Sequence, residues 1–94
     1  MDADCIVIGA GIVGAACARA LAAAGLDVLV LDDGQRGATA AGMGHLVAMD
    51  DNPAELALSS ASLAQWRDWS PRLPPACEAR ACGTLWIAAD ADEA

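Results

Sequence analysis

Three glycines near the start of the chain have the spacing of a turn that binds a diphosphate. The sequence Gly-Ala-Gly-Ile-Val-Gly occupies residues 9–14. In such a turn Gly9 permits the sharp bend, Gly11 lets the diphosphate approach the backbone, and Gly14 lets a helix lie close to a sheet. Glycine-rich turns are common, so this pattern alone is weak, and the elements around it decide its meaning.

The residues around the glycines supply the helix and the acid that such a site requires. Ile12 and Val13 fall in the first turn of a predicted helix, whose free N–H groups and dipole would face the phosphates. Asp32 follows 18 residues after the last of these glycines. Its carboxylate can accept hydrogen bonds from ribose hydroxyls, and it would repel a 2′-phosphate, which disfavours NADP. The sequence therefore predicts a dinucleotide site.

The elements that would position this site read as one strand–helix–strand unit. Residues 5–8 and 28–31 are short, apolar, β-branched runs, typical of strands buried in a parallel sheet. Residues 12–24 form an alanine-rich helix pattern, and Gly25 suits the left-handed position just after a helix. The predicted fold class is therefore α/β: a Rossmann-like FAD/NAD(P)-binding fold whose parallel sheet starts with a right-handed βαβ unit and is incomplete.

Three further segments follow the second predicted strand. Residues 34–44 are small and read as a loop that lets the backbone approach a ligand. Residues 54–69 predict a helix, with Pro53 near its first position and Ser-Pro at its end. Residues 81–89 predict a third strand.

The composition excludes several function classes. The net charge is −8, with no lysine, which argues against binding nucleic acid or an anionic membrane surface. We expect no transmembrane segment and no secretory signal, and thus a cytoplasmic protein, with peripheral contact with the inner membrane as the alternative. The four cysteines lack zinc-site spacing, and Cys5 and Cys17 are predicted to be small core residues.

Beyond the first motif, the chain resembles the FAD-dependent oxidoreductases of the D-amino-acid oxidase and glycine oxidase type. The likeness begins with Cys-Ile-Val-Ile-Gly-Ala-Gly-Ile-Val-Gly-Ala-Ala at residues 5–16. It continues through Val-Leu-Val-Leu-Asp at 28–32 and a second glycine-rich loop at 37–46. Cys-Gly-Thr-Leu-Trp-Ile-Ala at 82–88 resembles the family's first substrate-domain strand. Residues 40–53 suggest bacterial D-amino-acid and D-hydroxyproline dehydrogenases.

The resemblance implies FAD as cofactor, because the family's second loop runs past the diphosphate toward the flavin ring. Together, motif and resemblance give these cofactor-binding residues: Gly9, Gly11, Ile12, Val13, Gly14, Asp32, Asp33, Arg36, Thr39, Ala40, Gly44, His45 and Leu46.

Several of these assignments keep an alternative. Thr39 either contacts a phosphate or serves the turn, and His45 either lies beside the flavin or closes the loop. Relatives often carry a basic residue after the ribose-binding acid. Here Asp33 and a glycine stand there, so Arg36 is the nearest candidate. The histidine that tethers flavin in some relatives aligns near Ala41, so covalent attachment is not expected at this point.

The resemblance also implies an organisation and an activity. We expect residues 1–76 to be the N-terminal part of an FAD-binding domain, and residues 77–94 to hold the first strand of a truncated substrate domain. The chain is thus expected to be an N-terminal piece, inactive alone, of an enzyme that oxidises a C–N bond of an amino acid or amine. The alternatives are an NAD-dependent dehydrogenase domain and a non-catalytic nucleotide-binding subunit with a larger partner. The electron acceptor is open.

Overall fold

The computed structural model describes residues 2–49 and 52–92. The chain divides into two compact units, Met1–His45 and Leu46–Ala94. The domain boundary expected after residue 76 is not tested by this division and stays a prediction.

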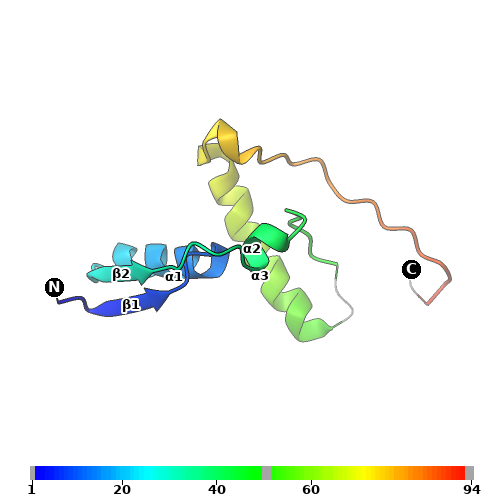
Figure 1. Cartoon of the computed structure of the whole chain (residues 1–94). Coiled ribbons are helices and arrows are strands. Elements are labelled where there is room, and N and C mark those ends of the chain that lie inside the picture. The colour runs from blue at the N-terminus through cyan, green and yellow to red at the C-terminus, as the bar shows by residue number, and fades with distance from the viewer. Residues whose placement is uncertain (1, 50–51, 93–94) are drawn as a thin grey trace. The chain divides into compact units, whose positions relative to one another are not determined.

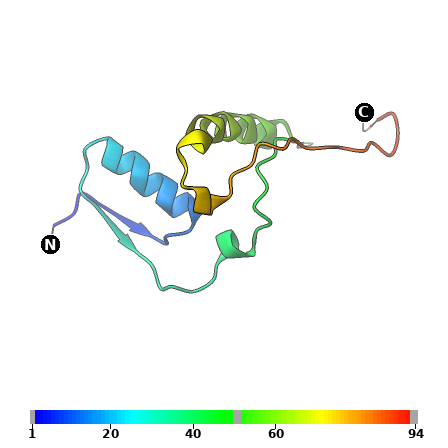
Figure 2. The ribbon, with the colours of Figure 1, turned by 90° about the horizontal axis from the view of Figure 1, so that it is seen from above.

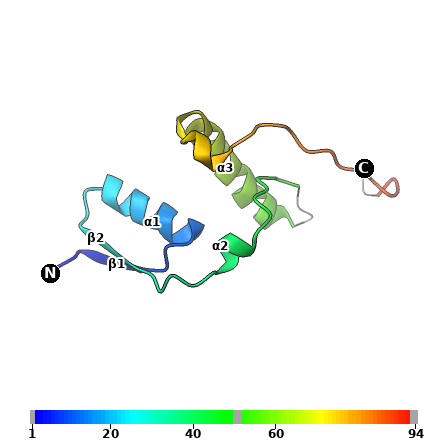
Figure 3. The same cartoon turned by 45° about the horizontal axis from the view of Figure 1, so that its top comes forward.

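The first unit contains the predicted strand–helix–strand arrangement. Strand β1 (Cys5–Ile8) is followed by helix α1 (Ile12–Ala23) and strand β2 (Val28–Leu31). The two strands pair in parallel, with Cys5 opposite Val28 and Ile8 opposite Leu31. Helix α1 lies along one face of the strand pair (Figures 1 and 3). The predicted α/β fold class is confirmed, as the βαβ start of a Rossmann-like sheet.

One stripe of α1 packs on the strands. Gly14, Ala18 and Leu21 are its half-buried residues, and their spacing of four and three residues places them on one helix face. A side chain at Gly14 would meet the Val7 side chain at 3.5 Å, so this stripe faces β1. Alternation along β1 leaves Ile8 on the other face, 87% exposed.

The prediction that both early cysteines are core residues is wrong for Cys17. Cys5 is half-buried in β1, whereas Cys17 is exposed. The reason is helical geometry, because Cys17 lies outside the stripe of α1 that faces the strands. No side chain is fully buried in the described part of the chain.

Helix α1 ends as the sequence predicts. Gly25 has a φ of 87°, a conformation that glycine adopts without the penalty of a side chain. Its N–H donates to the Ala22 carbonyl at 3.0 Å, and the Leu26 N–H donates to the Leu21 carbonyl at 3.3 Å. This pair of bonds is the Schellman motif, which directs the chain back toward β2.

The segment after β2 is more ordered than predicted. The small residues over 34–44 predict a loop, yet Ala38–Ala41 form one turn of helix, α2. The chain that leaves β2 leads directly into this turn, as Figure 2 shows from above. Alanines favour helix, and Gly37 precedes them in an extended conformation suited to a helix start.

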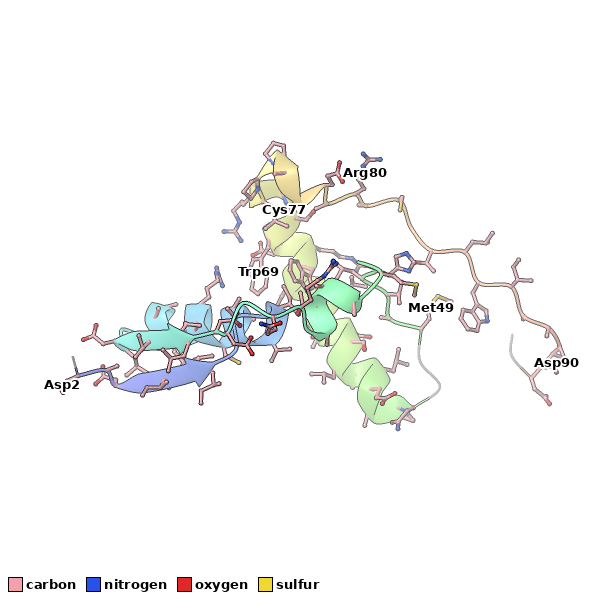
Figure 4. The ribbon with its side chains drawn as sticks, in the orientation of Figure 1. Asp2, Met49, Trp69, Cys77, Arg80 and Asp90 are labelled. Carbon is pink, nitrogen blue, oxygen red and sulfur yellow. The ribbon has the colours of Figure 1, made fainter. Side chains whose placement is uncertain are left out.

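In the second unit, helix α3 spans Pro53–Trp69, as predicted. The Asn52 side chain accepts a hydrogen bond from the Ala54 N–H at 2.9 Å, and proline at the first position needs no partner for its nitrogen. The indoles of Trp66 and Trp69 meet edge to face at 5.4 Å (Trp69 is labelled in Figure 4). None of the described helices is long and apolar enough to cross a membrane.

The strand predicted at residues 81–89 does not form. Two short 3₁₀ turns, η1 (Ser70–Arg72) and η2 (Pro75–Cys77), follow α3. The chain then runs past Arg80 to Asp90 without helix or strand (Figure 4). Leu85 and Ile87 are more than 80% exposed. A strand needs a partner for its backbone hydrogen bonds, and no described strand pairs with this segment.

Candidate cofactor-binding site

The site begins at the turn that leads out of β1. The Gly9 N–H donates to the Leu31 carbonyl at 2.7 Å, which holds the turn against the end of β2. Gly9 then takes a φ of 100°, which side-chain-bearing residues rarely adopt. A side chain at Gly14 would overlap the Gly9 carbonyl oxygen. The first and third glycines of the motif are therefore both required by the path of the backbone.

The turn delivers the chain to the amino end of α1, where backbone donors gather. Gly11 is the helix N-cap and supplies no side-chain cap. The first N–H groups of a helix lack an acceptor within it. Among the described residues, no protein acceptor takes the N–H groups of Gly11, Val13 or Gly14. Three donors and the positive end of the helix dipole thus remain for an anion.

Asp32 follows β2 directly and contacts the same turn. Its Oδ2 accepts a hydrogen bond from the Ala10 N–H at 2.7 Å, and its Oδ1 accepts one from the Gly34 N–H at 2.8 Å. An ionised carboxylate has about four acceptor positions. Two remain for other donors on an exposed side chain, so Asp32 can bind a pair of hydroxyls while it holds the turn.

These two bonds also favour the ionised form of the acid. The Ala10 and Gly34 amides, in that order of size, lower the pKa of the Asp32 carboxyl from its ordinary value of 3.8, because both favour the ionised form. Slight desolvation opposes them. A carboxyl with the ordinary value of 3.8 is already anionic at neutral pH, and the two amides extend this state to lower pH. The anion is the form in which a carboxylate accepts hydrogen bonds from ribose hydroxyls most strongly.

Thr39 joins the second loop to the first turn. Its Oγ1 accepts a hydrogen bond from the Ile12 N–H at 2.9 Å, across 27 residues of sequence. Thr39 lies in α2 and Ile12 starts α1. The structure thus brings together seven of the predicted residues at the carboxyl end of the two strands. They are Gly9, Gly11, Ile12, Val13, Gly14, Asp32 and Thr39.

The remaining predicted residues do not contact this cluster. The Asp33 carboxylate accepts only from the Gln35 N–H, at 3.0 Å, among the described contacts. Arg36 is exposed on the segment toward α2. The Ala40 N–H donates within the turn of α2, to the Gly37 carbonyl.

Three predicted residues lie in the sequence where the first unit ends and the second begins. Gly44 has a φ of 71°, and His45 is exposed at the end of the first unit. Leu46 begins the second unit. The role beside the flavin proposed for His45 stays a prediction.

Comparison with known proteins decides the family. The sequence profile of the FAD dependent oxidoreductase family matches residues 4–94, nearly the whole chain. The chain belongs to this family. As an FAD-dependent oxidoreductase it is a flavoprotein, and its cofactor is FAD. No solved structure matches the chain.

The residues of this FAD-dependent oxidoreductase fit the ADP half of FAD. The donors of Gly11, Val13 and Gly14 suit the diphosphate, and a glycine at this position of the motif lets a diphosphate come close to the backbone. The free acceptor positions of Asp32 suit ribose hydroxyls. Bound FAD would supply the two-electron acceptor of the reaction.

Two contributors to the site were not predicted from the sequence. Gly34 carries a local signal, because an Asp-x-Gly sequence favours a turn in which the carboxylate accepts from the backbone two residues on. Ala10 carries none, since any residue has an N–H and its partner Asp32 lies 22 residues away.

Proposed function

We propose that this chain holds the ADP half of FAD in a flavoenzyme that oxidises a C–N bond of an amino acid or amine. The observation that carries the proposal is the juxtaposition of free α1 amides with the anionic Asp32 at one end of the strand pair. The family match supports FAD and oxidoreductase chemistry. The likeness of residues 37–46 and 82–88 to the D-amino-acid oxidase type supports the amino-acid or amine substrate.

Each group in the site has a separate task in the proposed complex. The amides of α1 would hold the diphosphate through hydrogen bonds in which no proton is transferred. Asp32 holds the ribose as an acceptor and keeps the turn at Ala10 closed with its Oδ2. Thr39 can still make its predicted contact with a phosphate, because its hydroxyl accepts from the Ile12 N–H and keeps its own proton to donate.

Competition binding with parts of the cofactor tests this proposal. We expect the purified chain to bind FAD and ADP at one site, with AMP at least about tenfold weaker because it lacks the second phosphate. FMN, which has no adenosine, should not displace ADP. Isothermal titration calorimetry with ADP, followed by displacement with each compound, gives the order. Displacement of ADP by FMN would place the flavin half at this site and overturn the proposal.

The proposed substrate class is tested in a separate assay, on an enzyme that contains the catalytic residues. We expect the full flavoenzyme to reduce a dye with amino acids or amines and not with 2-hydroxy acids. The 94-residue chain loaded with FAD should reduce no dye. Equal reduction with 2-hydroxy acids would leave the FAD site intact and refute the proposed C–N chemistry.

A further inference from the structure

The hydroxyl of Thr39 lies where a side chain at Gly11 would be. A Cβ built at Gly11 would come 2.9 Å from Thr39 Oγ1 and 3.8 Å from Thr39 Cβ. Carbon atoms do not approach a hydroxyl oxygen this closely without displacement. The missing side chain of Gly11 therefore has a second consequence besides access for a diphosphate: it lets Thr39 reach the backbone of α1.

That contact completes the start of α1. Helices usually receive their first cap from a serine, threonine, aspartate or asparagine at the N-cap itself. Gly11 occupies the N-cap here and has no side chain to offer. Thr39 supplies the missing acceptor to the Ile12 N–H from the second loop. The same hydrogen bond thus caps α1 and ties α2 to the start of α1.

We propose that Thr39 is a positioning residue of the FAD site, which holds the second loop against the phosphate-binding turn before the cofactor arrives. The expected effect on cofactor binding rests on the proposed function, whereas the contact between Thr39 and Ile12 does not. Binding is weakened when a loop must be ordered at the same time, and a loop that is already tied avoids that cost. Removal of the tie should therefore weaken ADP binding although the diphosphate donors of α1 remain.

The contact can be tested first in the chain without cofactor. Thr39→Val keeps the shape and removes the hydroxyl, whereas Thr39→Ser keeps the hydroxyl as the matched control. Loss of one hydrogen bond should raise amide exchange at Ile12 about fivefold in Thr39→Val, with exchange in the middle of α1 unchanged. Thr39→Ser should exchange like the parent chain. Equal exchange at Ile12 in all three proteins would overturn the proposal.

The link between Gly11 and Thr39 is then tested by a double-mutant cycle on ADP affinity. Thr39→Ala should weaken ADP binding about fivefold, and Gly11→Ala should weaken it more, because it blocks the approach and expels Thr39. In the double variant the close contact is gone, so its loss should be smaller than the product of the two single losses. Independent effects would overturn the proposal.

The two measurements separate this inference from the proposed function. If the parent chain binds no ADP, the proposed function fails, and the exchange at Ile12 still decides whether Thr39 positions the loop. If ADP binds but Thr39→Val has parental affinity and exchange, the positioning role alone fails. Thr39→Ser must restore both quantities, which a merely steric role of Thr39 would not require.

Discussion

At the scale of single residues, Asp32 combines two tasks on one carboxylate. Both of its oxygens already accept backbone N–H groups, from Ala10 and Gly34, yet the side chain is exposed and retains free acceptor positions. An acid that had only to meet ribose would not need these bonds. Asp32 therefore fixes the shape of the turn, and its remaining acceptor positions are the ones proposed to meet the ribose.

Substitution of this acid should change nucleotide preference. Asp32→Asn removes the charge and turns one acceptor oxygen into a donor, so we expect ADP to bind on the order of tenfold more weakly. Adenosine 2′,5′-bisphosphate should lose less, because its 2′-phosphate is no longer repelled. Asp27→Asn is the control, since it makes the same charge change at the other end of β2. Equal losses for both nucleotides in calorimetry would contradict this reading of Asp32.

The same carboxylate should make the first unit sensitive to acid. Its pKa is lowered in the folded chain, first by the Ala10 amide and then by the Gly34 amide. A group with a lowered folded pKa stabilises the fold above its ordinary value of 3.8, and this contribution is lost as the pH falls from there through the folded pKa.

Carboxyl ¹³C NMR of Asp32 should therefore show a midpoint below 3.8. Stability measured by urea unfolding should drop over the same range, and Asp32→Asn should reduce that drop. A midpoint at or above the ordinary value would show that the two amides do not bind the carboxylate in solution.

At the scale of the elements, the packing of α1 on β1 depends on Gly14. A methyl group there would overlap the Gly9 carbonyl oxygen and meet Val7 Cγ1 at 3.5 Å. The helix must move away to accommodate it, which typically costs about 1–3 kcal/mol. Gly14→Ala should thus lower the free energy of unfolding by that amount and weaken ADP binding, because the helix donors move.

Gly42→Ala is the matched control for this change. Its φ of −69° suits alanine, and a methyl there would lie 3.6 Å from the Ala38 carbonyl oxygen, an ordinary contact. We expect a change in unfolding free energy of about 0.5 kcal/mol or less. Equal effects of the two substitutions in urea unfolding would show that α1 does not lie close to the turn.

The elements also show which parts of the structure can be read from the sequence. The bounds of β1, α1 and β2 agree almost to the residue with the prediction. Apolar runs and Gly25 determine the structure of residues close to them in the sequence, so their effect can be read locally. The strand over residues 81–89 was wrong, since a strand depends on a partner that the pattern itself does not contain. The bonds of Asp32 to Ala10 and of Thr39 to Ile12 span 22 and 27 residues, and no local spacing encodes them.

At the scale of the whole chain, what matters is how little apolar surface is buried. No described side chain is fully buried, and Ile6, Ile8 and Leu31 are 56%, 87% and 48% exposed. The apolar part of the first unit's stability therefore comes from the single layer of contacts between α1 and one face of the strands. The opposite face of the strands contributes little to this stability, because its apolar side chains are exposed.

A pair of substitutions on adjacent residues of β1 tests where this stability lies. Val7 is half-buried near α1, and Ile8 is 87% exposed. Threonine preserves β-branching at either position, so strand preference is nearly constant and the burial of the side chain decides the effect. Val7→Thr should cost about 1 kcal/mol in urea unfolding, because a hydroxyl replaces a methyl beneath the helix. Ile8→Thr should stay within about 0.5 kcal/mol. If Ile8→Thr proved the more costly, the exposed face would be covered in solution, and the single-layer account of stability would be wrong.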